Sequence, residues 1–311
     1  MSLNKEIWIR DIQEQLYLNN TFMERATDHS MYIIPGNRKV HIPNAGSKPT
    51  VVINRSSLPA SASQRTDVDL TYDVNDFTID PQVLNKFEEL EINYDKRKSL
   101  LFNQYKELGQ TIANNTLYSW APSGVTASII RTSGASQTAA LAPSATGARL
   151  SLTLKDVATA RAVLDKQNVP QDGRVMIIPS DIFNFDLLAI ANINQYLQFG
   201  TAVTPNGQIK QVYGFDIYSR PSVCVYGTGS GSGCTPKAIN DAGDPSSPTT
   251  TDNMAILCYH PDFVSKAQSE PYVFLQLQNP LFYGDVYSAG VLQGSSPLRS
   301  DGAGIVAIVQ I

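Results

Sequence analysis

The chain has 311 residues, of which 42% are hydrophobic and 17% are charged, and its formal net charge at pH 7 is −4. The length allows one large domain or two ordinary ones with a real core. The charged fraction is below the ~25% typical of soluble proteins, so we expect a surface rich in uncharged polar residues or covered by partners. The small negative charge without a basic tail argues against a dedicated nucleic-acid binder, and no apolar run approaches the ~18 residues of a membrane-spanning helix.

The N-terminal segment predicts a helix over residues 2–18. Trp8, Ile12 and Leu16 recur at helical spacing and place a narrow apolar stripe on that helix. A stripe this narrow favours packing against something outside the helix's own domain. A second short helix is expected over residues 21–27. The start of the chain lacks the apolar stretch of a signal peptide, so we expect a cytosolic product.

The segment after these helices predicts an extended arm. Short strands are expected at residues 32–34 and 39–42. Residues 49–54 and 66–79 are expected to pair as a long two-stranded ribbon around the small polar loop 58–64. Alternation gives the second strand one apolar face, formed by Val68, Leu70, Tyr72 and Val74. Because an isolated two-stranded ribbon is only marginally stable in water, we expect it to lie on another surface.

A long helix is predicted to follow the arm, from Pro81 to Leu117. Asp80 suits the N-cap and Pro81 the first helical position, where no backbone donor is needed. Such a helix would be about 55 Å long, beyond the ~8–20 residues usual in globular proteins. Apolar residues at helical spacing are expected to pack along it: Val83, Phe87, Leu90, Tyr94, Leu101, Tyr105, Leu108 and Ile112.

The charges on this predicted helix allow two interpretations. Glu88 and Glu91 lie shortly before Arg97, and they would form either a charge patch between subunits or a solvated face. In the second case, local ion pairs would contribute about 0.3–0.5 kcal/mol each. Both interpretations stay open at this point.

The second half of the chain alternates helix and strand signals. A polar stretch over residues 119–151 predicts mostly loop, with one strand near residues 125–131. Thr153 is expected to cap a helix, which a turn and a buried strand ending at Pro179 follow. The expected elements are helices over 154–166, 180–190 and 262–268, a turn over 168–173, strands over 174–178, 213–218, 254–259, 272–277, 283–292 and 304–311, and a flexible Gly/Ser-rich loop over 227–251.

The sequence offers no pattern for catalysis or metal binding. His29, His41 and His260 are far apart and form no close pair, so we expect them to be ordinary polar residues. The glycine-rich run that starts at Gly227 lacks the Lys-Ser/Thr of a phosphate-binding loop and fails the spacing of a nucleophile elbow. We therefore expect no enzyme activity, no cofactor and no metal.

The three cysteines are Cys224, Cys234 and Cys258, and they form no CxxC pair. A cytosolic origin favours free thiols. A bond between Cys224 and Cys234, which flank the Gly/Ser-rich run, stays open for an oxidising setting.

The order of the parts resembles one family of viral coat proteins. Residues 163–179 hold a helix end, an Asn-Val-Pro turn and a Gly-Arg strand, residues 214–219 hold a Gly-Phe strand, and residues 301–306 open the last strand. Together with an N-terminal arm, a β-arm and a long helix, these segments resemble the major capsid proteins of tailed bacteriophages. The resemblance covers nearly the whole chain and implies an α+β fold of the Hong Kong 97 type.

The resemblance also implies a division of the chain. The implied parts are an N-terminal arm over residues 1–34, an extended β-arm (E-loop) over 35–79, a peripheral domain with a spine helix over 80–152, an axial domain over 153–268 with its flexible loop, and C-terminal strands returning to the peripheral domain over 269–311. The family resemblance implies a coat subunit, not an enzyme. It would assemble as homo-pentamers and homo-hexamers into an icosahedral head enclosing double-stranded DNA without sequence-specific binding.

Further expectations follow from the same resemblance. The chain would be made in the bacterial host cytoplasm and become part of the virion, with portal, scaffolding and decoration proteins as partners and no membrane. The residues expected to contact other subunits are Trp8, Ile12, Leu16, Val51, Ile53, Val68, Leu70, Tyr72, Glu88, Glu91 and Arg97. The alternatives are an encapsulin-type nanocompartment shell of the same fold, a small carboxylate-based hydrolase and a virion decoration protein. A long exposed arm argues against the hydrolase, and the long helix argues against the decoration protein.

Overall fold

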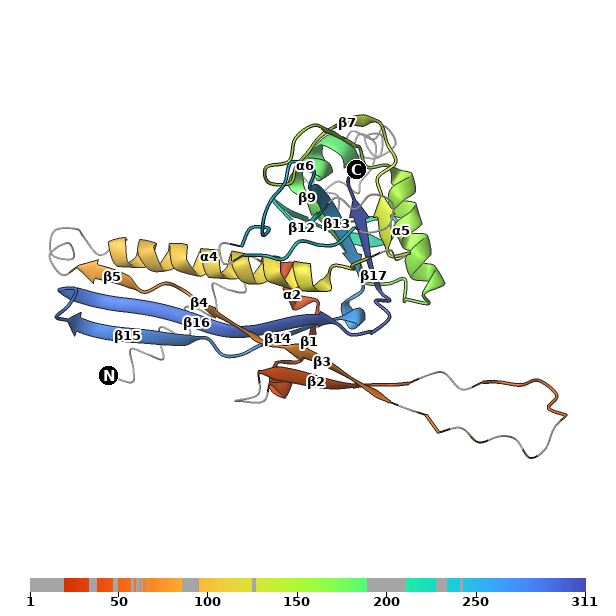
Figure 1. The fold of residues 1–311 in the computed structure, drawn as a ribbon, viewed down its shortest axis with the longest axis horizontal. Coiled ribbons are helices and arrows are strands. Elements are labelled where there is room, and N and C mark those ends of the chain that lie inside the picture. Colours follow the sequence, from red (N-terminus) through yellow and green to blue (C-terminus); the bar gives the residue numbers. More distant parts are fainter. Residues whose placement is uncertain are drawn as a thin grey trace.

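The computed structural model describes residues 20–33, 38–46, 50–56, 59, 62, 64–65, 67–85, 95–124, 127–188, 211–227, 234–240 and 243–311. In these residues a long helix lies along an elongated sheet, a compact α/β part sits above one end of the helix, and a two-stranded arm leaves from that same end (Figure 1). The opposite end of the elongated sheet is called the distal end below.

The elongated sheet has six strands within the described residues, in the order β1-β14-β16-β15, with β4 and β5 also paired to β16. Its helix, α4 (Asp95–Trp120), spans 26 residues. Gln293 of β16 donates to the Thr116 hydroxyl of α4 at 2.7 Å, and the Trp120 indole donates to the Ser265 carbonyl at 3.0 Å. The strands are β1 (Thr27–Asp28), β4 (Asn75–Thr78), β5 (Gln82–Asn85), β14 (Val264–Gln268), β15 (Tyr272–Asn279) and β16 (Gly284–Pro297).

The α/β part is built on a second sheet, which has seven strands among the described residues. Its order is β10-β11-β9-β13-β17-β6, with β12 also paired to β13. One face packs toward α4 and the other toward α5 (Leu154–Lys166), so β9, β13 and β17 are buried throughout. The strands are β6 (Ile129–Arg131), β9 (Arg174–Pro179), β10 (Gln211–Val212), β11 (Phe215–Arg220), β12 (Cys224–Tyr226), β13 (Asn253–Tyr259) and β17 (Ile305–Val309).

The arm begins as an antiparallel pair, β2 (Lys39–Asn44) and β3 (Val68–Asp73). Its root packs on the elongated sheet, where Val40 and Tyr72 form a small core with Ala267 of β14. Gly294 of β16 lets the root approach closely, because a Cβ there would lie 2.7 Å from the Asp73 carbonyl oxygen and 3.2 Å from the Tyr72 ring.

Smaller elements connect these parts. They are α2 (Thr21–Glu24), the 3₁₀ turns η1 (Ser30–Tyr32) and η3 (Pro261–Phe263), the hairpin β7 (Ser136–Ala139)–β8 (Ala148–Leu150), and the short helix α6 (Ser180–Ile182) that continues into the π-helical turn η2 (Phe183–Leu187). Phe22 of α2 meets Trp120 edge-on, with ring centroids 6.1 Å apart, and this contact fastens the N-terminal part to α4.

Several predictions are confirmed where local signals are strong. Helix α5 begins with Thr153, whose side chain accepts from Asp156 in a capping box. The expected turn has Asn168 and Gly173 at φ values of 57° and 77°, and the buried strand β9 follows. Strands β13, β15, β16 and β17 lie where alternation and apolar runs place them.

The largest correction concerns the predicted helix over 81–117. Residues 82–85 form β5, with Val83 opposite Val286 of β16, so Asp80 and Pro81 do not begin a helix. Pairing with β16 outweighs the local capping signal. In place of the predicted helix over 81–117, the structure describes α4, which spans Asp95–Trp120. Residues 262–268 are likewise not a helix, because β14 lies between β1 and β16.

The arm also differs from its prediction. Residues 50–54 form no strand, and the partner of β3 is β2. The predicted strand 66–79 divides at Val74 into β3 of the arm and β4 of the elongated sheet. Tyr32 lies in η1 rather than in a strand.

Two further findings concern the later part of the chain. The segment 119–151 contains the unpredicted hairpin β7–β8, which pairs locally. Strand β17 lies in the seven-stranded sheet between β13 and β6, whereas β15 and β16 lie in the elongated sheet.

Candidate functional site

The described residues contain no group of three or more His, Cys, Asp or Glu side chains placed to hold a metal ion. His29, His41 and His260 lie in separate places, next to η1, in β2 and before η3. The features that distinguish this molecule are exposed apolar surfaces. Two of them lie at its two ends and are described below.

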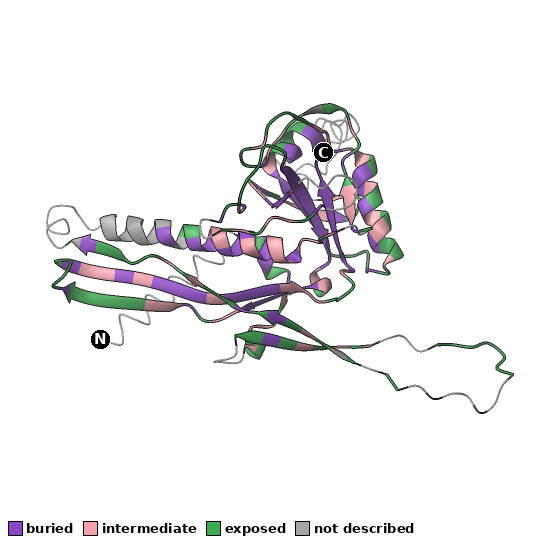
Figure 2. Cartoon of the chain, viewed as in Figure 1, coloured by how far each residue is buried: buried purple, intermediate pink, exposed green. Residues whose placement is uncertain are grey.

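The first surface, called the distal patch below, covers the distal end of the elongated sheet, much of which is exposed (Figure 2). Leu281 and Tyr283 are 82% and 73% exposed in the β15–β16 turn, and Phe274 of β15 is 62% exposed. Soluble proteins rarely leave large contiguous apolar surfaces exposed. The distal patch comprises Val83, Phe274, Leu275, Leu277, Leu281, Phe282 and Tyr283.

The second surface lies on the arm beyond its root. Val51 and Ile53 are 86% and 85% exposed, and Val52 is 50% exposed. These β-branched residues are suited to a strand but form none among the described residues of this chain. Among the described residues, the arm tip thus presents exposed apolar side chains.

Polar contacts hold the arm root at a defined angle to the sheet. Arg38 Nη2 lies 3.6 Å from Asp76 Oδ2, and the Tyr272 hydroxyl donates to the same Asp76 side chain. Burial, followed by the neighbouring Asp76 carboxylate, raises the pKa of Tyr272 to about 12. Tyr272 therefore stays a neutral donor at neutral pH.

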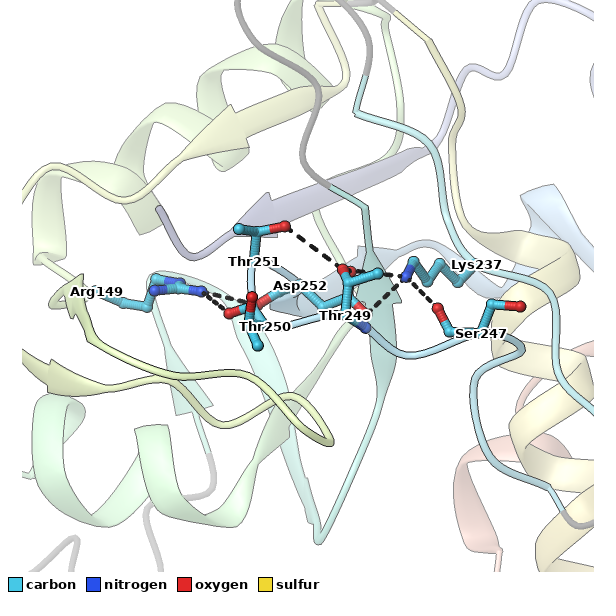
Figure 3. A network of polar contacts seen from close by, with 7 residues as sticks. All are labelled: Arg149, Lys237, Ser247, Thr249, Thr250, Thr251 and Asp252. Carbon is cyan, nitrogen blue, oxygen red and sulfur yellow. Dashed lines mark hydrogen bonds and ion pairs between the residues drawn. The ribbon is translucent and has the colours of Figure 1, made fainter.

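A polar network holds the segment that follows the Gly/Ser-rich run (Figure 3). Lys237 Nζ lies 2.7 Å from Asp252 Oδ2 and donates to the Ser247 carbonyl at 2.8 Å, while Asp252 is fully buried. The Thr249 amide also donates to Asp252 at 2.8 Å. Burial alone would raise the pKa of Asp252, but the hydrogen bonds from Lys237 and Thr249 hold that pKa below its usual value.

The network lies within the predicted flexible loop 227–251. Hydrogen bonds hold its described residues although 247–251 are exposed, and Arg149 of β8 donates to the Thr250 and Asp252 carbonyls. On the other side, Asn114 of α4 donates to the Gly243 carbonyl at 2.8 Å. The segment therefore connects the α/β part to α4.

The three cysteines are all described, buried and free, which confirms the prediction of free thiols. Burial raises the pKa of Cys224 to about 12 and also raises the pKa of Cys258. Neither thiol forms a reactive thiolate at neutral pH.

The predicted packing residues of the long helix have three outcomes. Leu108 and Ile112 lie in α4 and are buried, at 6% and 3% exposure. Val83 is wrong, because it lies exposed in β5. Leu101 and Tyr105 lie in α4 without described side chains, and the remaining three fall outside the described residues: Phe87, Leu90 and Tyr94.

The predicted contact residues divide similarly. Val51 and Ile53 are exposed, as a contact requires, and Leu70 is half-buried. Tyr72 is wrong, because it is only 8% exposed and packs on Val40 of its own chain. The side chains of Val68 and Arg97 are not described, and five residues fall outside the described part: Trp8, Ile12, Leu16, Glu88 and Glu91.

Sequence reasoning missed the distal patch. Its signal is the run from Tyr272 to Asn279, which combines apolar residues with glutamines and contains no charge. A strand whose two faces both carry large apolar residues is expected to be covered on both sides. Only the structure shows that this strand ends its sheet.

Comparison with known proteins finds similar folds among solved structures. No family model and no curated protein matches the sequence. The chain is similar to the solved capsid structure of the cyanophage P-SCSP1u (TM-score 0.62, 15% identity, 91% of this chain and 86% of that chain). It is also similar to the mature capsid of bacteriophage PhiM1 (TM-score 0.60, 12% identity, 92% and 86%) and to the capsid of Ralstonia phage GP4 (TM-score 0.60, 9% identity, 92% and 86%).

These matches confirm the resemblance to phage capsid proteins at the level of an α+β fold that extends over most of both chains. None of the helices among the described residues is long and apolar enough to cross a membrane.

Proposed function

We propose that this chain is the major capsid protein of a tailed bacteriophage, with a fold of the Hong Kong 97 type. In this proposal it is a structural protein without enzymatic activity. It assembles through pentamers and hexamers into an icosahedral head that encloses double-stranded DNA. The observation that carries the proposal is a fold shared over most of its length with phage capsid structures, combined with an arm on which Val51 and Ile53 are exposed.

The physical basis is the separation of two apolar surfaces. The arm tip and the distal patch lie at opposite ends of the long axis, so one copy cannot bring its own two surfaces together (Figure 1). Contacts between different surfaces of successive copies are heterologous, and they close into rings when the rotation between copies allows it. Rings of five and six that share such contacts form a closed shell.

The charge of the chain is compatible with this role. A net charge of −4 provides no strong attraction to phosphate, so DNA would be enclosed rather than gripped. Portal, scaffolding and decoration proteins are the further partners that such a head would use. In this proposal the chain is made in the bacterial host cytoplasm and ends in the virion.

A second candidate is an encapsulin-type nanocompartment shell, which the same fold and the same exposed ends would serve. The two candidates differ in particle size and contents. Small particles, empty or filled with enzyme, would favour the nanocompartment, whereas phage-head-sized shells would favour the capsid.

The test is to express the full chain and to measure its size by light scattering and electron microscopy. We expect rings of five and six subunits, or megadalton shells. A chain that stays monomeric across protein concentrations, also when co-expressed with the neighbouring genes of its genome, would refute the proposal.

A further inference from the structure

We propose that residues 20–25, which include α2, form a detachable strap. The strap leaves the rest of the chain as one unit, and the buried guanidinium of Arg220 beneath Phe22 keeps its docking weak. This strap is a property of the single subunit, and it does not depend on the proposed function.

Arg220 is the first observation, because it is a buried cation without a counter-ion among the described residues. It ends β11 and is only 7% exposed. Its Nη1 atom is buried without a hydrogen-bond partner, and its Nη2 donates to Asn114 Oδ1 of α4 over a long 3.3 Å. Burial lowers the pKa of Arg220 to about 10, so the guanidinium is still charged at neutral pH. A buried charge with so few partners costs free energy in the folded state.

Arg174 shows how the same chain pairs another buried arginine. It is 1% exposed, its Nη2 lies 2.7 Å from Asp165 Oδ1, and it donates to the carbonyls of Val169 and Pro170 at 2.7 and 2.8 Å. One buried arginine therefore has a carboxylate and two carbonyls, whereas the other has a single amide oxygen within the described residues. The incomplete pairing is a feature of Arg220 and not of arginine burial in this fold.

The strap covers Arg220 with an aromatic ring. The Arg220 guanidinium carbon lies 5.2 Å from the centre of the Phe22 ring, and Phe22 is 2% exposed. A phenyl ring attracts a cation but offers no acceptor oxygen, so this contact offsets only part of the cost of burying the charge. Nearer the surface, Arg25 of the strap pairs with Asp216, which shares a strand face with Arg220. The strap thus lies on β11 through a partly exposed ion pair and an incompletely paired cation.

The start of the strap has the same weakness. Asn20 is 6% exposed, and its Nδ2 donates to the Gly109 carbonyl of α4 at 3.2 Å, whereas its Oδ1 is buried without a partner. Its side chain makes no capping hydrogen bond to α2, which has only four residues. Because a helix this short is not stable on its own, the strap would gain conformational freedom once it leaves.

Detachment of the strap exchanges burial for hydration. Water would reach the Arg220 guanidinium and the Asn20 amide. This gain opposes the loss of the contacts that Phe22 makes with the Trp120 ring and the Tyr259 hydroxyl. We therefore expect the strap to open locally, at a lower free energy than the core. Opening ends before β1, because β1 pairs with β14 and holds the chain there.

Hydrogen exchange of the unassembled full chain, measured by mass spectrometry, tests the strap. The amides of residues 20–26 are compared with those of β13, which is buried throughout. In the wild type we expect the strap to exchange at least about tenfold faster than β13. Equal rates would overturn the strap, because these residues would then open only when the whole fold does.

Arg220→Met removes the buried charge and keeps an unbranched side chain. We expect it to slow exchange in residues 20–26 by about tenfold, since replacing a buried ionic group by an apolar one often stabilises the folded state. Arg174→Met is the matched control, because it removes an arginine that is paired; it should lower the thermal midpoint without slowing exchange in the strap. A folded Arg220→Met variant whose strap exchanges as fast as the wild type, or faster, would show that Arg220 holds the strap in place.

Asn114→Asp gives evidence that does not require the removal of Arg220. Asn114 Oδ1 already lies 3.3 Å from Arg220 Nη2, so this substitution places a carboxylate beside the guanidinium. It also removes the donor to the Gly243 carbonyl, and Asn114→Leu, which removes both contacts, controls for that loss. We expect exchange in residues 20–26 to be about tenfold slower in Asn114→Asp than in Asn114→Leu. Equal exchange in the two variants would refute the role of the missing counter-ion, also if Arg220→Met fails to fold.

Discussion

Replacing Asp252 by alanine tests whether the network of Figure 3 holds the segment 234–252 in place. The carboxylate is fully buried and accepts from Lys237 and from the Thr249 amide and hydroxyl. Removing one partner of a buried ion pair costs about 3–5 kcal/mol of unfolding free energy. The Lys237 side chain is 18% exposed and can recover some water, so we expect a loss near the lower limit, about 3 kcal/mol.

The measurement is chemical denaturation at pH 7, with Asp244→Ala as control. Asp244 is an exposed acid of the same segment, so its removal should change the unfolding free energy by less than about 0.5 kcal/mol. A loss below 1 kcal/mol for Asp252→Ala, or one equal to the loss for Asp244→Ala, would refute the reasoning.

The stability loss in Asp252→Ala is also expected to depend on pH. The folded-state pKa of Asp252 is lowered, so its contribution is fully present above the unfolded pKa, ~3.9, and disappears as the pH falls through the folded pKa. The difference in stability between the wild type and Asp252→Ala should therefore narrow as the pH is lowered below about 4. A difference that stays constant down to pH 3 would show that the charge of Asp252 contributes nothing.

Three further predictions concern the arm, the core and a helix cap. Deleting residues 50–66 should leave a soluble folded subunit that forms no shells, and normal particles in electron micrographs would contradict this. Leu117→Ala, at a fully buried position of α4, should lower the unfolding free energy by about 2–5 kcal/mol, against less than about 0.5 for the exposed Val83→Ala. Thr153→Ala should cost about 1 kcal/mol by removing the cap of α5, and restoration by Ser but not by Val would identify the hydroxyl as the cause.

Local signals predicted the α/β part well. Local sequence alone specifies three neighbouring features there: the Thr153 cap, the Asn-Val-Pro turn and the apolar strand up to Pro179. No long-range strand pairing overrides these local signals. Residues 82–85 show the opposite case, because proline after aspartate is a sound helix start, yet the strand pairing with β16 across 200 residues of sequence overrides it. A pairing between residues this far apart in the chain produces no signal in the local sequence.

The candidate site was predictable only in part. The exposed Val51 and Ile53 were expected contacts because a free arm must lie on something. Phe274 and Leu277 were read as ordinary strand residues, since alternation does not reveal whether a strand lies at an edge. The order of strands in a sheet is set by tertiary structure, so the distal patch can be recognised only once the fold is known.

The length and direction of β16 have a mechanical consequence. Its 14 residues run from the distal end at Gly284 to the arm root at Gly294 and beyond, and every other strand of the elongated sheet except β1 is bonded to it. Antiparallel hydrogen bonds are perpendicular to the strands. A pull between the two ends of the molecule therefore loads many of these bonds in shear at the same time, instead of opening them one by one. Tension along the long axis therefore acts on the sheet in the direction in which it resists best, whereas a force across the sheet would separate its strands one by one.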